Sequence, residues 1–238
     1  ALERPQVVFN AAAYTAVDQA EGDPETAMSV NSAGATNIAR AAAIADAAVV
    51  HISTDYVFNG KSRVPYKPDD APAPLNVYGE SKLAGEIGVR EACQRHLIVR
   101  TSWVYSHEGR NFVLTMLRAA GEGRDLRIVN DQTGSPTSSA DLAAALISAA
   151  TRLVDDQSVA GTYHFTNSGE TTWYEFAREI FRLRRLSPHI EPVTTEEFKA
   201  AATRPRWSVL DCSSFMETFG VDRRSWQSAL KEAMEKIP

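Results

Sequence analysis

Cysteine is almost absent from the 238-residue chain, where Cys93 and Cys212 stand far apart and outside any paired motif. Two isolated cysteines exclude a disulfide framework and a cysteine-based zinc site, and they favour a reducing compartment. The five histidines do not show metal-ligand spacing either. We therefore expect a cytoplasmic protein without a metal site.

An excess of positive charge and long apolar runs are also missing. The formal net charge is −5, whereas binding to nucleic acid or to an anionic membrane surface needs a basic face. No apolar run approaches the roughly 20 residues that a bilayer span requires. We therefore expect neither nucleic acid nor a membrane as a partner.

The most informative absence is that of a Gly-rich dinucleotide turn. No G-x-G-x-x-G segment occurs, and Gly121 and Gly123 follow a predicted helix rather than a strand. Such a turn normally connects the first strand and helix of a dinucleotide-binding sheet and holds the pyrophosphate. We therefore expect two βα units, about 50 residues, to precede Ala1 in the complete domain.

The part of the fold that the sequence does contain alternates strands with helices. Short β-branched runs at 6–10, 49–53, 97–100 and 163–166 predict buried strands, and alanine-rich and leucine-rich helical patterns lie at 31–45 and 78–92. This order predicts an α/β fold, a doubly wound parallel sheet of the Rossmann type that is N-terminally incomplete. Ligands of such sheets bind at the carboxyl ends of the strands.

The last third of the chain has a different pattern. Helices are predicted at 139–153, 171–185 and 224–236, and short extended pieces at 126–130 and 208–211. We interpret this as a smaller α/β lobe. The predicted division assigns 1–104 with 138–167 to a dinucleotide-binding domain, and 105–137 with 168–238 to a substrate-binding lobe.

Tyr78 and Lys82 are the first candidates for chemistry, because residues four apart share one face of a helix. A free phenol has a pKa of about 10, and a fixed cation nearby favours the phenolate and lowers that value. Thr54 ends a predicted strand 24 residues before Tyr78. Its hydroxyl can donate to the substrate oxygen that Tyr78 protonates, so we predict that these three residues are catalytic.

Six ordered segments resemble the dTDP-4-dehydrorhamnose reductase family, which belongs to the extended short-chain dehydrogenases/reductases. They are NAAAYTAVDQAE (10–21), HISTDYVFNG (51–60), PLNVYGESKLAGE (74–86), RTSWVYS (100–106), NDQTGSPT (130–137) and RPRWSVLD (204–211). The segments cover most of the chain in order. Asn59 stands where the family often has Asp, and Tyr14 where some members have His.

The resemblance implies roles for particular residues. Tyr78 is expected to donate the proton, Lys82 to orient the nicotinamide ribose and tune Tyr78, and Thr54 to complete the triad. The expected contacts of NADPH or NADH are Ala11, Ala12, Ala13, Tyr14, Thr15, Ser53, Tyr78 and Lys82. The expected contacts of the dTDP-sugar are Thr54, Asp55, Tyr56, Trp103, Gly134, Pro136, Thr137 and Arg204.

Two of the remaining side chains have two interpretations each, and a third has one. Trp103 can stack on the sugar or base, or simply pack. Arg204 can clamp a diphosphate bidentately, or it is an ordinary exposed loop arginine. His51 lies inside a predicted strand, and we predict that it packs in the core.

The resemblance implies an enzyme that reduces the C4 ketone of dTDP-4-dehydro-β-L-rhamnose with NADPH or NADH, and a homodimer is a possible assembly. Two alternatives stay open at this point. One is a non-catalytic relative of the kind represented by the regulatory subunit of methionine adenosyltransferase. The other is a different sugar-nucleotide reductase or an epimerase.

Overall fold

Four parallel strands form the central sheet of the computed structural model, which describes residues 3–237. The strands are β1 (Val7–Asn10), β2 (Ala48–Thr54), β3 (His96–Thr101) and β8 (Gly161–His164), and they lie side by side in that order. Every residue of β3 is buried, as are six of the seven residues of β2. Such strands read as continuous apolar runs because helices cover both faces of a parallel sheet. The predicted α/β class and parallel sheet are confirmed.

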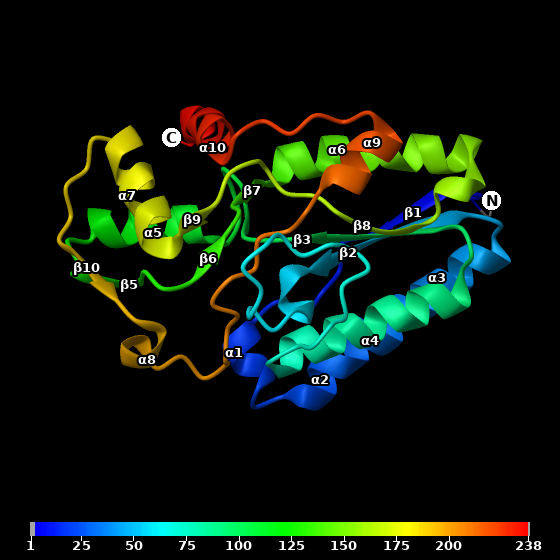
Figure 1. Ribbon diagram of the computed structural model, residues 1–238, viewed down its shortest axis with the longest axis horizontal. Coiled ribbons are helices and arrows are strands. Elements are labelled where there is room, and N and C mark those ends of the chain that lie inside the picture. The colour runs from blue at the N-terminus through cyan, green and yellow to red at the C-terminus, as the bar shows by residue number, and fades with distance from the viewer. Residues whose placement is uncertain (1–2, 238) are drawn as a thin grey trace.

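Helices cover both faces of this sheet. In Figure 1, α3 (Ala35–Ile44) and α4 (Val77–Ala92) lie below the strands, and α6 (Ser139–Asp155) and α9 (Ser213–Phe219) lie above them. A side chain at Gly85 or Gly88 of α4 would collide with Asn31 or Thr36 respectively. The two glycines therefore allow α4 and the neighbouring helical segment to approach closely.

The start of α4 is determined by a cap. Asn76 accepts a hydrogen bond from the Gly79 N–H at 2.8 Å, and its amide donates to the Thr203 carbonyl at 2.7 Å. An asparagine N-cap satisfies a backbone donor that has no partner within the helix. The cap places Tyr78 in the first helical turn, next to the carboxyl ends of the strands.

A continuous helical run precedes β2. It consists of α2 (Pro24–Met28), the π-helical turn η1 (Ser29–Gly34) and α3, and the short helix α1 (Val17–Ala20) comes before it. The prediction of a helix over 31–45 therefore missed the first seven residues of this run. π-Turns are rare and occur often at functional sites, and Asn31 within η1 contacts the site described below.

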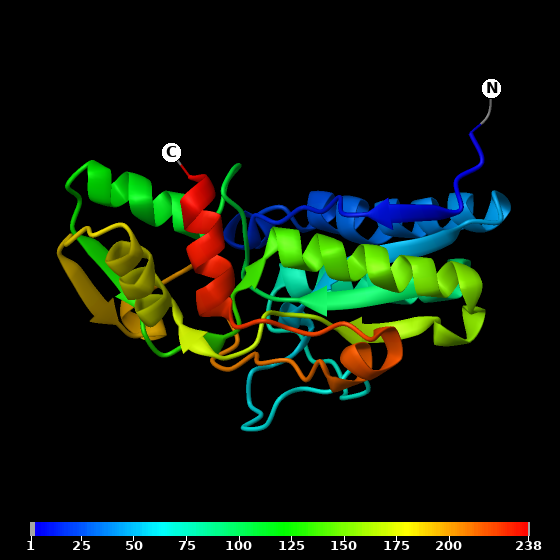
Figure 2. The same cartoon turned by 90° about the horizontal axis from the view of Figure 1, so that it is seen from above.

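A second lobe lies beside the sheet, at the left of Figures 1 and 2. Its elements are β5 (Leu126–Val129) paired with β10 (Ile190–Val193), and the helices α5 (Phe112–Gly121), α7 (Trp173–Leu183), α8 (Thr195–Phe198) and α10 (Trp226–Lys236). Buried aromatic and aliphatic residues such as Phe176, Ile180, Trp226 and Leu230 form its core. Burial of such large side chains stabilises the lobe, although it contains few strands.

Short paired strands lie between the two parts: β4 (Val104–Tyr105) with β7 (Thr137–Ser138), and β6 (Thr133–Gly134) with β9 (Thr171–Thr172). The 3₁₀ turns belong to the part with the sheet, where η2 (Asp55–Val57) follows β2 and η3 (Gln157–Val159) connects α6 to β8. The predicted extended piece 208–211 pairs with Tyr66 through a bridge at Leu210. Phe215 and Phe219 of α9 pack in the core of the sheet, although the predicted division assigns them to the substrate lobe.

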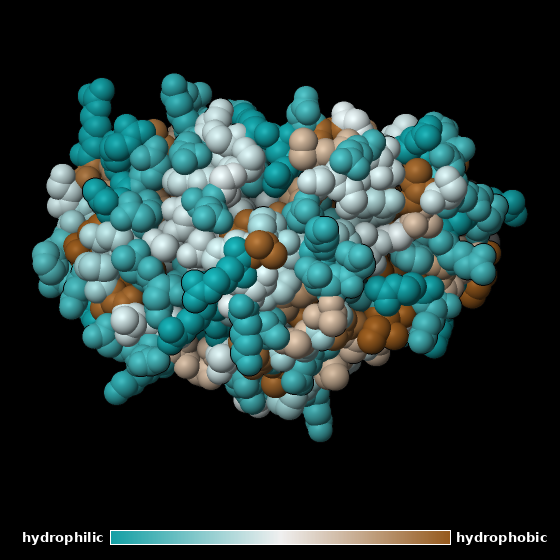
Figure 3. All heavy atoms as spheres, viewed as in Figure 1, coloured by the Kyte–Doolittle hydropathy of each residue, from teal (hydrophilic) through white to brown (hydrophobic). Residues whose placement is uncertain are grey.

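The surface is mixed in polarity. Hydrophilic residues predominate on the face drawn in Figure 3, and hydrophobic ones form small separate groups. Within residues 3–237, no helix is both long and apolar enough to cross a membrane. Cys93 and Cys212 are free thiols, and both are buried.

Candidate active site

A pocket of about 490 Å³ lies at the carboxyl ends of β1, β2 and β3. Its volume is in the range of small-molecule sites, and its position is the one that parallel sheets use for ligands. The second lobe closes the pocket with Trp173. Predicted site residues that line it are Ala11, Ala13, Thr15, Ser53, Thr54, Asp55, Tyr56, Tyr78, Lys82 and Trp103.

The phenol of Tyr78 is held in its protonated form. Burial raises the pKa of Tyr78 to about 12, a hydrogen bond with Thr54 lowers it, and the charge of Asp55 raises it. Tyr56 packs edge-on against the Tyr78 ring, with centroids 5.6 Å apart. A phenol that keeps its proton at neutral pH is suited to donate it to an oxygen that becomes negatively charged.

Lys82 lies deeper than Tyr78 and is almost completely buried, at 2% exposure. Its Nζ donates to the carbonyl of Ile52 at 2.6 Å. Burial lowers the pKa of Lys82 to about 8, and the charge of Glu86 opposes that shift. In this structure the Lys82 ammonium is directed at β2, and the groups that act on the pKa of the phenol besides burial are Thr54 and Asp55. That Lys82 tunes Tyr78 stays a prediction.

Asp55 is a buried carboxyl between two hydroxyls. Ser208 donates to its Oδ2 at 2.5 Å, and Thr54 donates to its Oδ1 at 3.1 Å. Burial raises the pKa of Asp55 to about 7, and the two hydrogen bonds only partly oppose this. The sequence predicted Asp55 at the site, but its link to Ser208, 153 residues away, depends on the tertiary structure.

We expect Asp55→Asn to remove a pH dependence of stability. The raised pKa means that the folded state keeps a proton which the unfolded chain loses near pH 4, so wild-type stability falls as the pH rises from about 4 to 7. For each pH unit in that window, the free energy of unfolding of wild type should fall by up to about 1.4 kcal/mol relative to that of the variant. Urea unfolding at pH 4.5, 6 and 7.5 measures the difference, and a constant difference would contradict the assignment.

Trp103 has an unusual backbone. Its φ of +50° lies in the left-handed region, which costs a non-glycine residue about 1–2 kcal/mol. The indole stacks on Trp173 with centroids 3.6 Å apart and an interplanar angle of 9°. The strained turn thus directs an aromatic ring from the sheet edge onto the second lobe, and both rings line the pocket.

Three predicted substrate contacts lie behind Trp103 instead of lining the pocket. Gly134, Pro136 and Thr137 are buried, and any side chain at 134 would collide with the Trp103 indole. Thr137 pairs with Val104 across β4 and β7, and its N–H donates to the Trp103 carbonyl. In this structure the 134–137 segment supports Trp103.

Arg204 is occupied by another part of the chain. Its guanidinium makes two hydrogen bonds with Asp18, at 2.9 and 2.6 Å, and one with the carbonyl of Ala202. It also lies close enough to Tyr56 for the two groups to shift each other's pKa. The structure does not place Arg204 among the residues that line the pocket. Its fork of N–H groups, which we expected to face a diphosphate, therefore joins α1 to the 202–204 loop.

Arg110 is a site residue that the sequence did not indicate. It lines the pocket next to Trp103 and Val104 and is exposed. Within the described part of the chain, its guanidinium has no hydrogen-bond or ion-pair partner. A single loop arginine has no signal in sequence, since only the fold brings it to the pocket.

The loop after β1 is held by an asparagine. Asn31 of η1 accepts from the Tyr14 N–H at 2.8 Å and donates to the Tyr14 carbonyl at 3.1 Å. Its amide nitrogen also lies 2.9 Å from the Ser81 hydroxyl on α4. Ala12 and Tyr14 do not line the pocket, whereas Ala11, Ala13 and Thr15 do.

A buried ion pair lies beneath the pocket. Glu86 of α4 makes two hydrogen bonds with Arg100 of β3, at 2.8 and 2.7 Å, and Ser53 donates to the same carboxylate at 2.6 Å. Glu86 is fully buried and Arg100 is 2% exposed. The predicted site residue Ser53 is therefore held in place by a charged group that sequence inspection had not singled out.

Metal ligands do not gather anywhere in the described part of the chain. Among residues 3–237, no three side chains of the His, Cys, Asp or Glu type come close enough to hold a metal ion.

A Rossmann-type sheet with Thr54, Tyr78 and Lys82 beside an alanine-lined strand end is typical of the extended short-chain dehydrogenases/reductases. The chain belongs to the family of the RmlD substrate binding domain, whose model matches residues 2–238. It is 42% identical over 240 residues to dTDP-4-dehydrorhamnose reductase of Escherichia coli (strain K12), covering 98% of this chain and 80% of that one.

Other relatives agree with this assignment. A spore coat polysaccharide biosynthesis protein, SpsK of Bacillus subtilis (strain 168), is 44% identical over 233 residues, with 98% of this chain and 80% of the relative covered. The crystal structure of dTDP-4-dehydrorhamnose reductase from Bacillus anthracis in complex with NADP superposes with a TM-score of 0.91 at 41% identity. That match covers 98% of this chain and 81% of the other.

Proposed function

We propose that this protein reduces the C4 ketone of dTDP-4-dehydro-β-L-rhamnose to dTDP-L-rhamnose with NADPH or NADH. The observation that carries the proposal is the protonated Tyr78 phenol beside the Thr54 hydroxyl in a pocket at the sheet's carboxyl edge. Relatives that are 40–42% identical over nearly the whole chain are named for this reaction.

The residues divide the chemistry between them. Tyr78 donates its proton to the C4 oxygen as negative charge develops there. When substrate is bound, the Thr54 hydroxyl turns from Asp55 Oδ1 and donates its hydrogen bond to the same oxygen. Asp55 and Tyr56 shape the sugar side of the pocket, and the Trp103–Trp173 stack forms an apolar wall of it.

The pocket fits a nicotinamide cofactor on its β1 side. Ala11 and Ala13 carry side chains small enough to leave the backbone accessible to a flat ring, and Thr15 follows them along the pocket. Lys82 lines the same pocket, and its ammonium has N–H groups beyond the one donated to Ile52 that can donate to ribose hydroxyls. When bound, the cofactor supplies the hydride, and the residues of this chain bind and orient it.

The test is an NAD(P)H oxidation assay on the full-length gene product with the 4-keto-rhamnose nucleotide, followed at 340 nm. Consumption of cofactor with formation of dTDP-L-rhamnose is expected. Without any turnover, the reductase assignment would be withdrawn. Tightly bound NAD in the purified protein with no net reduction would instead favour an epimerase.

Thr54→Val is expected to slow turnover by roughly 10- to 10³-fold, since it removes one hydrogen bond to charge that develops in the transition state. Valine keeps the volume and the β-branching, so the strand end should persist. Steady-state kinetics measures kcat, and circular dichroism confirms folding.

Thr101→Val at the end of the neighbouring strand β3 is the matched control, because Thr101 lines the same pocket but makes no side-chain hydrogen bond within residues 3–237. Equal losses in the two variants would contradict a specific role for Thr54.

We propose that Arg110 contacts the nucleotide diphosphate and that Arg204 contributes indirectly through Tyr56. Arg110→Ala should weaken binding of dTDP by about 1–3 kcal/mol, the value of a hydrogen bond to a charged group. Arg204→Ala should have a smaller effect on affinity, because its guanidinium is already paired with Asp18. Calorimetry with dTDP compares the two variants. If Arg204→Ala weakens binding more than Arg110→Ala does, Arg204 and not Arg110 contacts the diphosphate.

The proposal also includes a cytoplasmic location and a possible homodimer. The two free buried thiols agree with a reducing compartment. Light scattering on the full-length gene product decides the oligomeric state.

A further inference from the structure

His51 is buried directly beneath the candidate site. It is 0% exposed, and in the register of β1 and β2 it lies opposite Asn10, which is 3% exposed. Its Nδ1 is 3.0 Å from the Asn10 amide nitrogen, and its Nε2 is 3.5 Å from Lys82 Nζ. The imidazole therefore connects the end of β1 to the buried lysine.

The orientation of the Asn10 amide determines where the His51 proton lies. Asn10 Oδ1 accepts from the Ala12 N–H at 3.3 Å, so the amide NH₂ faces His51 Nδ1. An NH₂ group can only donate, so Nδ1 must be the acceptor. A neutral imidazole then carries its proton on Nε2, which faces Lys82. Burial and the charge of Lys82 lower the pKa of His51 to about 3, which keeps the ring neutral.

Other charged groups near Lys82 are balanced or remote from its Nζ. Glu86, one turn further along α4, favours the ammonium, but Arg100 from β3 neutralises that carboxylate. Tyr78 of α4 keeps its proton, and Asp55 of η2 acts on Tyr78. The carbonyl of Ile52 is the acceptor that Lys82 uses. The Nε2–H of His51 therefore faces the ammonium of Lys82, and both groups are hydrogen-bond donors.

We propose that His51 is a positioning residue for Lys82: Asn10 holds the His51 proton on Nε2, and this N–H group opposes the ammonium and couples its protonation to the turn after β1. That turn, Asn10 to Ala12, is followed by the alanine-lined side of the pocket. The inference rests on the proposed function only for the statement that Lys82 contacts a cofactor. The coupling itself is a property of the protein alone.

The test is a measurement of the pKa of Lys82 by NMR in protein labelled with [¹³C]lysine, with Lys82→Met to assign the signal. His51→Gln can turn a carbonyl oxygen toward the ammonium in place of an N–H group, so the pKa of Lys82 should rise by at least about half a unit. Asn10→Ala does not touch Lys82, but it frees the His51 proton to move to Nδ1, and it should raise the same pKa. In the double variant, the effects should not add, because both act through one imidazole.

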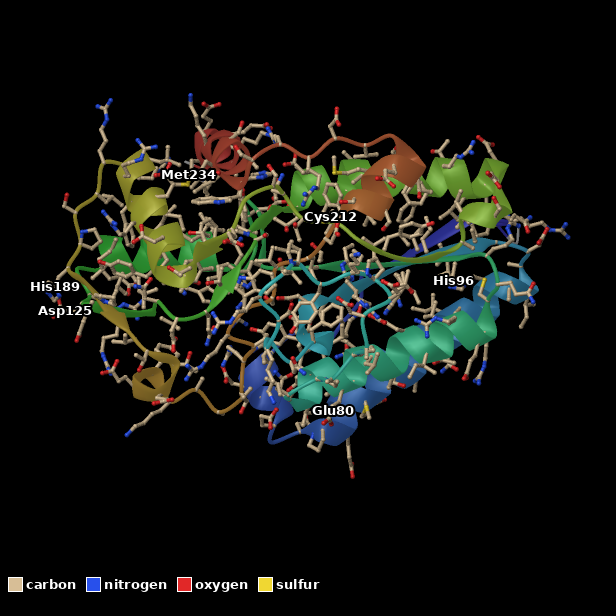
Figure 4. All side chains as sticks on the ribbon, viewed as in Figure 1. Glu80, His96, Asp125, His189, Cys212 and Met234 are labelled. Atoms are coloured by element: carbon tan, nitrogen blue, oxygen red, sulfur yellow. The ribbon has the colours of Figure 1, made fainter. Side chains whose placement is uncertain are left out.

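His96→Gln is the matched control. His96 is also buried in the sheet and its pKa is also lowered, but it lies at the opposite end of the strands, near the end of α4, as labelled in Figure 4. Its substitution should leave the pKa of Lys82 unchanged. Long-range ¹H–¹⁵N NMR of the wild type should find the His51 proton on Nε2.

Two results overturn the inference: a proton on Nδ1, or an unchanged pKa of Lys82 in both His51→Gln and Asn10→Ala. Neither measurement needs turnover. A protein that shows the shifts but does not reduce the keto-sugar would therefore refute the proposed function and leave this inference in place.

Discussion

Tyr78→Phe is expected to lower kcat by about 10²- to 10⁴-fold, the usual contribution of general acid catalysis. The substitution removes one oxygen and keeps the ring that packs edge-on against Tyr56. Because burial holds the phenol protonated at neutral pH, the lost group is the proton donor itself. Steady-state kinetics of the full-length gene product at saturating NAD(P)H and keto-sugar measures the effect.

Tyr163→Phe is the matched control for this substitution. Tyr163 is partly buried in β8, and its hydroxyl donates to the Val159 carbonyl, outside the pocket. The variant loses the same atom as Tyr78→Phe, but at a position outside the pocket. Its kcat should therefore stay within about twofold of wild type, while its free energy of unfolding falls by roughly 1 kcal/mol. If Tyr78→Phe keeps more than about half of the wild-type turnover, Tyr78 is not the proton donor.

Glu86→Gln is expected to reduce the free energy of unfolding by about 3–5 kcal/mol, the usual cost of leaving one member of a buried ion pair without its partner. Arg100 is 2% exposed, and besides the carboxylate its guanidinium donates to the carbonyl of Pro68. The variant should also release Ser53, whose hydroxyl donates to the same carboxylate. Urea unfolding measures the loss.

Two comparisons make this result specific. Glu179→Gln is the same chemical change in an exposed pair with Arg182, and it should leave the urea midpoint nearly unchanged. The double variant Glu86→Gln with Arg100→Met removes the buried charge and should be more stable than Glu86→Gln alone. If the double variant is destabilised by the sum of the effects of Glu86→Gln alone and Arg100→Met alone, the ion pair is not what stabilises the fold here.

The sequence by itself determined the local elements and the catalytic spacing. The strands β1, β2, β3 and β8 and the helix α4 follow from hydrophobic period and β-branching, which are local properties. Tyr78 and Lys82 share a helix face because they are four residues apart. Thr54 was predictable as the end of a buried strand, and strand ends in a parallel sheet gather at one edge.

Only the tertiary structure decided which groups these residues meet. Lys82 meets His51 and the Ile52 carbonyl instead of Tyr78, Arg204 meets Asp18, and Trp103 stacks on Trp173. These partners are 30 to 186 residues apart in sequence, and the two indoles are 70 residues apart. Such pairings depend on strand register, helix packing and the docking of two lobes, and burial then sets the pKa values. No local pattern in the sequence carries that information, because it arises when distant surfaces are brought together and water is excluded.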